Sequence, residues 1–337
     1  STYDDVFGVE PPRVYTNFHS INFQKRVKAS ISNVLLKRAF SSYEGFNDVV
    51  NAIQRTLVTS MIDEESKSST QLFAQAHAGG FAYPVKINSN ITLPQESGKV
   101  YLDEPALKYN AAVEKEIVHN FAVGASRDYN WMGVSQLTDI GRVIFITTPK
   151  YLSSQDVGVL AAAFNMDKTE FLGRTIEVKN LGGAEKDGAI GFIVSEDWFQ
   201  IWLQSREMTQ IYNPVKRVWN FWYFTDGTFS TSLMENCVEL VDSMKSITSV
   251  TITAGQKAAK CASTEIVAKV VKGEETGGWS SKLNWSIKGN NSKKTFISPS
   301  GILYVANDET ASTISVTATS AQDPSKTDTK DVTVTES

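Results

Sequence analysis

The residues able to do chemistry are few and lie far apart in this sequence. Three histidines, His19, His77 and His119, could transfer protons, and two cysteines, Cys237 and Cys261, could act as nucleophiles or metal ligands. Each histidine lies in an unrelated segment, and two cysteines are too few for a disulfide framework or a cysteine-built zinc site. We therefore expect the histidines to be surface or hydrogen-bonded structural residues, and we expect no metal site.

The acidic run Asp63, Glu64 and Glu65 could supply the carboxylate pair of a hydrolase. No acid at a comparable spacing and no hydrophobic pocket accompany it, so the expected role is a solvated helix face. The sequence also lacks the patterns GxGxxG, GxxxxGK[ST], HExxH, GxSxG and CxxC, which carry nucleotide-binding, metalloprotease, hydrolase and redox chemistry. We therefore predict a protein that is not an enzyme and that binds no cofactor.

The segment VKRVWNFWYFTDG concentrates large aromatic side chains. Successive residues of a strand point to opposite faces, so Trp219, Phe221 and Tyr223 are expected on one face and Trp222 on the other. Such a strand is buried on two sides, either within the chain or by a neighbouring copy. These four residues are therefore the candidate subunit-contact or core strand.

The tryptophans Trp198, Trp202, Trp219 and Trp222 could instead form a stacking platform for sugars or bases. Packing in a core of helices and strands, or contact between subunits, is the favoured interpretation. Trp279 lies in the turn-like sequence GGWSS. We therefore expect Trp222 to matter more than Trp279 for assembly or solubility.

Upstream of residue 247 the pattern is mixed α and β. Residues 13–31 alternate loosely between β-branched or aromatic and polar residues and predict an extended strand, whereas apolar residues every three or four positions over 47–77 predict a long helix. We expect further helices over 106–123, Ser153–Asn165 and Glu196–Gln204, and strands over 142–148, 174–180 and 189–195.

Length and charge narrow the class of protein. At 337 residues the chain exceeds the roughly 250 to 300 residues at which one core usually stops growing, so two domains are expected. The net charge of −4 comes with dispersed lysines and arginines, which argues against a dedicated nucleic-acid groove or a membrane-surface patch. No apolar run approaches a membrane span, and the first residues lack the pattern of a signal peptide, so we expect synthesis in the cytoplasm.

The C-terminal residues 247–337 differ in character, with abundant Ser, Thr and Lys, no Arg and a net charge of +1. Short alternating segments separated by Gly, Asn, Asp and Pro-Ser turns predict a small β-sandwich. The stretch TFISPSGILYV predicts a hairpin within it. The candidate core residues are Trp285, Ile302, Ile314 and Val316.

Two resemblances to known families follow from these segments. The tail, with LNWSIKGN, SGILYVAN, TISVTATS, DPSKT and a closing VTV, resembles a bacterial immunoglobulin-like domain of group 2. The upstream part resembles the major capsid protein of short-tailed phages of Gram-positive bacteria, through PPRVYTNFHSINFQKRVKASIS, LKRAFSSYEGFNDVVNAIQRTLVTSMIDEESK, AAAFNMDKTEFLGRTIEVKN, IGFIVSEDWFQIW and YNPVKRVWNFWYFTDGTFSTSLMENCVEL.

The capsid resemblance implies an α+β tailed-phage capsid fold, with an extended loop, a spine helix and peripheral and axial domains, followed by an all-β immunoglobulin-like sandwich. In this sequence the loop strand would be 13–31, the spine helix 47–77 and the axial domain the part from about 106, within a shell domain of residues 1–246 and a surface domain of residues 247–337. The surface domain would be a decoration that carries no element of the shell fold.

The same resemblance implies the function and the partners. Copies of the chain would assemble as hexamers and pentamers into an icosahedral phage head, a virion capsid enclosing double-stranded DNA. Partners would be scaffolding and portal proteins, DNA held by weak non-specific contacts, and a host cell-wall glycan at the C-terminal domain, with no membrane. The alternative is a bacterial surface adhesin or cell-wall-binding protein, and a hydrolase with an accessory module would need a catalytic set that the sequence does not offer.

Overall fold

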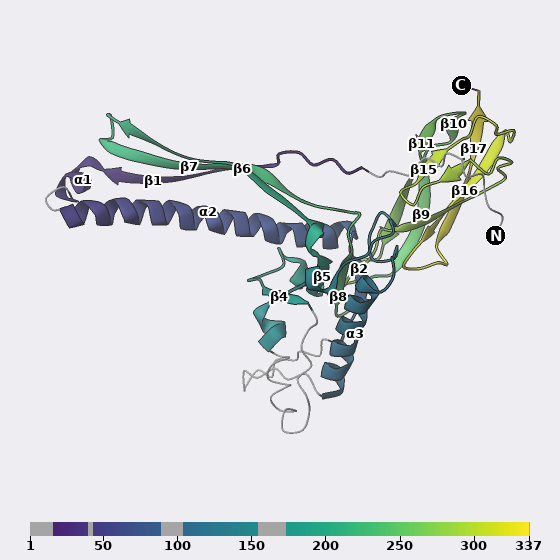
Figure 1. Ribbon diagram of the computed structural model, residues 1–337, viewed down its shortest axis with the longest axis horizontal. Helices are drawn as coiled ribbons and strands as arrows, with labels where there is room; N and C mark the ends of the chain where they lie inside the picture. Colours follow the sequence, from purple (N-terminus) through teal and green to yellow (C-terminus); the bar gives the residue numbers. More distant parts are fainter. Residues whose placement is uncertain (1–15, 40–42, 89–103, 154–172, 337) are drawn as a thin grey trace, which may run out of the picture.

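A computed structural model describes residues 16–39, 43–88, 104–153 and 173–336 of the chain. Figure 1 shows three parts: a long arm, a central sheet with a helix descending from it, and a C-terminal region of strands on the side opposite the arm. We call these the arm, the sheet body and the C-terminal β-region. The helix expected over Ser153–Asn165 and the first residues of the strand expected over 13–31 lie outside the described residues, apart from Ser153.

The sheet body is a five-stranded mixed sheet. Its strand order is β2-β8-β5-β3-β4, with β2 parallel to β8, β3 parallel to β4, and β5 antiparallel to both of its neighbours. The strands are β2 Tyr83–Lys86, β8 Cys237–Val241, β5 Ala189–Ser195, β3 Val143–Thr147 and β4 Arg174–Glu177. All five residues of β3 and of β8 are buried, because apolar clusters cover both faces of the sheet.

Two helices supply those clusters. The last turns of α2, Tyr43–Gly79, place Leu72 and Phe73 against one face, where they meet Phe192 and Trp198. The helix α3, Glu104–Ala122, covers the other face with Ile117, Val118 and Phe121. Each helix therefore presents an apolar stripe to the sheet, as the three- and four-residue spacing of its apolar positions predicts.

The arm consists of a three-stranded antiparallel sheet lying along most of α2 (Figure 1). With 37 residues, α2 is roughly 55 Å long, and its last turns reach the sheet body. The strand order is β1-β7-β6, with β1 Phe23–Ser32, β7 Val218–Thr231 and β6 Phe199–Asn213. A short helix α1, Asn33–Ala39, directly follows β1 and precedes α2 in the chain. The helix expected over 47–77 is thus present and extends a few residues further at each end.

The helix expected over Glu196–Gln204 was wrong. Only Glu196–Trp198 forms a single 3-10 turn, and β6 begins at Phe199. A short apolar run fits either a helix or a strand by its pattern alone. Here the strand is favoured because β6 pairs with β7 from one end to the other, through partners such as Ile201 with Phe229 and Tyr212 with Trp219.

The C-terminal β-region contains nine described strands. They form a four-stranded sheet β10-β17-β16-β13, a three-stranded sheet β11-β15-β14 and the pair β12-β9. Their bounds are β9 Ile247–Ala254, β10 Lys257–Ala259, β11 Ser263–Glu265, β12 Val267–Lys272, β13 Leu283–Lys288, β14 Phe296–Ile297, β15 Ile302–Tyr304, β16 Thr313–Ser320 and β17 Thr327–Thr335. The hairpin expected from TFISPSGILYV is present, because β14 pairs antiparallel with β15.

The core of the C-terminal β-region is built largely from its alternating strands. Ile314 and Val316 are fully buried in it, and Trp285 packs against them. Ile302 was assigned to this core incorrectly: its side chain is 41% exposed, and the next residue, Leu303, is 0% exposed. The alternation of β15 is therefore shifted by one residue from the predicted phase, which turns the opposite set of side chains inward.

Among the described residues, no helix is both long enough and apolar enough to cross a membrane.

Candidate interaction surface

The aromatic strand predicted from the sequence is β7, the central strand of the arm. Trp219, Phe221, Trp222 and Tyr223 are all half-buried there, and their alternation divides them between two faces. The face that carries Trp219, Phe221 and Tyr223 is turned toward α2, and the face that carries Trp222 is turned away from it. The structure brings the four residues together, but the described part of the chain covers neither face completely.

The helix-facing side of the arm is closed near the sheet body. There Phe23, Met61 and Phe229 form a buried cluster, and the rings of Phe23 and Phe229 lie 4.5 Å apart. Tyr223 packs against this cluster from β7. This contact fixes the inner half of the arm on α2.

Further out, the same side opens into an apolar groove between α2 and the hairpin of β6 and β7. The groove has a volume of about 460 Å³. Its lining comes from α1, α2 and the hairpin and is mostly apolar: Leu36, Val50, Ile53, Gln54, Met208, Thr209, Gln210, Trp219 and Phe221. In the outer half of the arm, a groove therefore separates α2 from the sheet. In the inner half, a packed apolar cluster fills the space between them.

The face turned away from α2 carries an aromatic pair with a cation. The rings of Trp222 and Phe224 are stacked with centroids 6.3 Å apart, and Nζ of Lys28 lies 5.0 Å from the centre of the Trp222 ring. A lysine over an indole is weakly attracted by the ring. This arrangement leaves both aromatic rings at the surface of the described chain.

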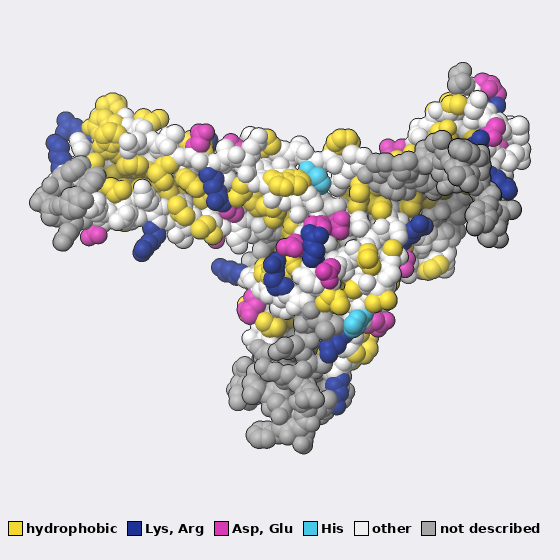
Figure 2. All heavy atoms as spheres, in the orientation of Figure 1, with side chains coloured by type: hydrophobic (Ala, Val, Ile, Leu, Met, Phe, Trp, Pro, Cys, Tyr) yellow, Lys and Arg dark blue, Asp and Glu magenta, His cyan; other side chains and the backbone are white. Residues whose placement is uncertain are grey.

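Exposed apolar side chains follow the hairpin outward. Trp202 is 53% exposed, Ile211 61% and Val215, in the turn between β6 and β7, 90%. Figure 2 shows hydrophobic side chains gathered over this part of the molecule. Exposed apolar side chains gathered along one hairpin are a feature of interaction sites in soluble proteins.

Ion pairs fix the acidic run of α2 to the arm strands. Glu65 receives two hydrogen bonds from Arg206 of β6, and Glu64 lies 3.4 Å from Nζ of Lys25 in β1. The hydrogen bond from Lys67 to Glu64 lowers the pKa of that carboxyl. The run thus faces basic side chains and solvent, in keeping with its expected role as a helix face.

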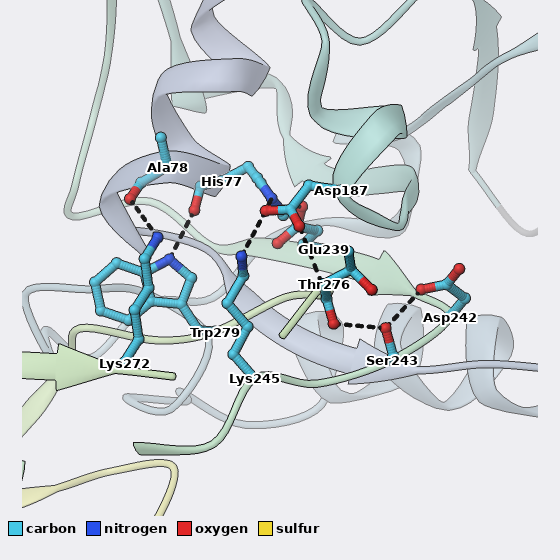
Figure 3. A network of polar contacts seen from close by, with 11 residues as sticks. His77, Ala78, Asp187, Glu239, Asp242, Ser243, Lys245, Lys272, Thr276 and Trp279 are labelled. Atoms are coloured by element: carbon cyan, nitrogen blue, oxygen red, sulfur yellow. Dashed lines mark hydrogen bonds and ion pairs between the residues drawn. The ribbon is translucent and has the colours of Figure 1, made fainter. Parts of the chain in front are cut away.

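The three histidines do not meet. His19 contacts Ser230, His119 is exposed on α3, and His77 is buried between Glu239 and Asp187 (Figure 3). Sequence reasoning missed the last of these contacts. The one feature of the sequence that could have indicated this contact is Glu239, an acidic residue in the middle of the apolar strand CVELV.

Neither cysteine forms part of a reactive set. Cys237 is buried in β8, and burial raises the pKa of its thiol well above the ordinary value, while Cys261 is exposed. Within the described part of the chain, no group of three or more His, Cys, Asp or Glu side chains is placed to hold a metal ion. The surface of the arm is therefore the strongest candidate for function.

Comparison with known proteins adds an independent finding. Residues 1–241 match the profile of the family described as Phi29-like phage major capsid protein. The major capsid protein of Bacillus phage B103 is 29% identical over 307 residues, which cover 90% of this chain and 65% of that protein. The major capsid protein of Bacillus phage PZA is also 29% identical, over 305 residues with the same coverage. The chain thus spans just under two thirds of the length of these two curated relatives.

Among solved structures, a chain of the capsid of Staphylococcus phage Andhra aligns with 66% of this chain and 70% of its own length, at a TM-score of 0.47 and 11% identity.

Proposed function

Because the chain belongs to the Phi29-like phage major capsid protein family, we propose that it is the subunit from which a phage head is built. The observation that carries the proposal is the family match over residues 1–241, which includes the whole arm and sheet body. The family is structural, so the role is assembly and not catalysis. The match supports this function and not the alternative of a bacterial surface adhesin.

In this proposal the arm is the main contact between neighbouring copies. Its exposed apolar side chains, such as Ile211 and Val215, would be covered by an adjacent subunit, because burying them releases them from water. The arm of one copy would meet a different surface on the next. Contacts between unlike surfaces close into rings, which suits hexamers and pentamers made from one chain.

The finer assignments belong to the same proposal. The loop strand β1 and the long helix α2 fit the extended loop and spine helix of a capsid subunit, and the sheet body fits its axial domain. Residues 1–246 and 247–337 would then be the shell domain and an immunoglobulin-like domain on the outer surface. The nine described strands and the near-neutral composition of the C-terminal β-region support the second assignment.

Partners follow from the role of a shell. Double-stranded DNA would lie inside and be contacted weakly, since basic residues are dispersed and the net charge is −4. Scaffolding and portal proteins would take part in assembly. A host cell-wall glycan at the C-terminal β-region stays a prediction from the sequence.

The test compares two isoleucines that are exposed on strands of different regions. Ile211→Asp alters the arm, and Ile302→Asp is the matched control on the C-terminal β-region, where the side chain is also exposed. We expect wild type and Ile302→Asp to give closed particles by sedimentation and negative-stain imaging. Ile211→Asp should remain as folded subunits with an unchanged melting temperature. Normal particles from Ile211→Asp would contradict the assignment of the subunit contact to the arm.

A further inference from the structure

The C-terminal end of α2 is capped by the C-terminal β-region. The last carbonyl groups of a helix have no partner within the helix. Here Nε1 of Trp279 donates to the carbonyl of His77 at 3.0 Å, and Nζ of Lys272 donates to that of Ala78 at 3.4 Å (Figure 3). The backbone and side chain of Ser281 both donate to the carbonyl of Gly80. Donors from one distant segment thus satisfy the end of the helix.

The fit at this end is close. Trp279 is only 7% exposed, and Nζ of Lys272 lies 4.3 Å from the centre of its ring, where a cation also suits the negative end of the helix dipole. Gly80 has a φ of 64°, and a Cβ there would lie 2.7 Å from the backbone nitrogen of Ser281 and 2.9 Å from the ring of Trp279. Only glycine allows the chain to turn here beneath the indole.

A buried cluster of acids and bases joins the same parts. The two ring nitrogens of His77 lie 2.6 Å from Oε1 of Glu239 and 2.9 Å from Oδ2 of Asp187. Nζ of Lys245, from the segment between β8 and β9, lies 2.6 Å from that same oxygen of Asp187. Lys245 and Glu239 are buried, so each charge in the cluster depends on its partners.

The protonation of this cluster agrees with its geometry. Burial opposes the charged form of His77, but the hydrogen bonds and charges of Glu239 and Asp187 outweigh it and raise the pKa of the imidazole. Burial raises the pKa of Glu239. Burial acts to raise the pKa of Asp187 too, yet the hydrogen bonds from Lys245 and His77 lower it. These shifts in pKa favour the protonated forms of His77 and Glu239 and the ionised form of Asp187.

A second set of contacts reaches the loop between α3 and β3. Lys282 is buried, and its Nζ donates to the backbone carbonyls of Arg127 and Asp128, the latter at 3.1 Å. Nε1 of Trp131, in the same loop, donates to the hydroxyl of Ser281 at 2.9 Å. Burial lowers the pKa of Lys282 to about 8, which shows how far this amine is removed from water.

From these contacts we propose that the C-terminal β-region braces the sheet body. Its segment 272–282, with Lys245, holds the end of α2 and the loop 127–131 in place. From the sequence, this region was expected to carry no element of the shell fold. In the proposal it instead completes the polar contacts at the end of the spine helix α2. The brace acts within one subunit, so it stands or falls independently of the proposed role in a phage head.

The test is hydrogen exchange, measured by mass spectrometry on unassembled full-length protein. Lys245→Met removes the ammonium partner of Asp187 and leaves the contact of Asp187 with His77 in place, and Lys330→Met is the matched control at an exposed lysine of β17. We expect amides of residues 76–82 to exchange about tenfold faster in Lys245→Met and at the wild-type rate in Lys330→Met. Lys272→Met is the milder second variant, and it should speed exchange in the same residues.

Two results would overturn the brace. One is exchange in residues 76–82 that stays at the wild-type rate in both Lys245→Met and Lys272→Met. The other is an increase spread equally over these residues and β16, which would show general loss of stability instead of a local coupling.

Discussion

The arm and the C-terminal β-region are both built from antiparallel strands, but they leave their apolar side chains in different places. In the C-terminal β-region, the inward side chains of β16 are fully buried in one cluster. In the arm, the residues of β7 from Val218 to Phe224 are only half-buried, although β7 is the central strand. The described residues leave this central strand only partly covered, so a further surface could bury it, and this is the physical basis for proposing subunit contacts on the arm.

Polar groups show the same contrast. Arg206 and Glu65 of the arm form an ion pair at the surface. Glu309 of the C-terminal β-region is 1% exposed and accepts hydrogen bonds from the backbone of Asn291, Ser292 and Ala311. Changes at exposed positions of the arm are therefore expected to be tolerated in the isolated subunit, whereas changes at buried polar positions of the C-terminal β-region, such as Glu309, are not.

The largest expected effect is a difference in stability between alanine variants of two tryptophans. Trp279→Ala should lower the free energy of unfolding by about 3–5 kcal/mol, because it empties a buried site and removes the indole hydrogen bond to the carbonyl of His77, which then keeps only the hydrogen bond from the backbone N–H of Gly80. Trp222→Ala should cost about 1 kcal/mol, because its ring is only half-buried, and should instead reduce the yield of particles. Urea denaturation and sedimentation measure the two effects.

The structure thus reverses part of the expectation from sequence, which ranked Trp222 above Trp279 for solubility as well as for assembly. If Trp222→Ala destabilised the subunit as much as Trp279→Ala, the contrast between the two regions would fail.

A smaller effect is expected at Glu309. Burial opposes its charge, but the hydrogen bonds from the backbone of Ala311, Asn291 and Ser292 and from the hydroxyl of Thr295 lower its pKa to about 2. Glu309→Gln should cost about 1–3 kcal/mol at neutral pH, since the amide cannot accept all of these hydrogen bonds. Because the folded pKa lies below the unfolded value of about 4.5, this contribution is complete above pH 4.5 and is lost as the pH falls toward 2.

The measurement for Glu309 is urea denaturation of wild type and variant at neutral and at acidic pH. Glu274→Gln, at an exposed position of the same region, is the control and should leave the stability unchanged at both. A stability difference for Glu309→Gln that is as large near pH 2 as at neutral pH would show that its charge is not responsible.

The smallest effect is expected on the arm. Arg206→Met removes the ion pair with Glu65 and should cost about 0.2–1 kcal/mol, because the arginine is exposed to water. A double-mutant cycle with Glu65→Gln, at low and at high salt, isolates the pair and should show a smaller coupling at high salt. A coupling that exceeds the effect of Glu309→Gln would mean that the arm stabilises itself through its charges.

Much of the fold could be predicted from local pattern. The three- and four-residue apolar spacing gave the long helix α2, and the alternation around Ser-Pro-Ser-Gly gave the hairpin of β14 and β15. The aromatic strand β7 was also recognised, with its two faces. In each of these cases the spacing of neighbouring residues is itself the cause of the structure, because it sets which side chains share a face.

The predictions failed where contacts between residues far apart in the sequence determine the local structure. The run after Glu196 became strand β6 because β7 offered a partner along its whole length, and no local pattern shows that partner. The prediction for β15 turned Ile302 inward, whereas the structure buries Leu303. Which of the two side chains is buried depends on the face of β15 that the other strands cover.

The sequence by itself therefore determined most of the helices and strands, the absence of catalytic motifs and the resemblance to capsid proteins. Only the tertiary structure decided that Trp279 of a turn-like segment is buried and bonded to His77, 202 residues away, and that His77 meets Glu239, 162 residues away. The physical reason is that burial and charge pairing depend on which surfaces meet in space, whereas periodicity depends on the order of neighbouring residues.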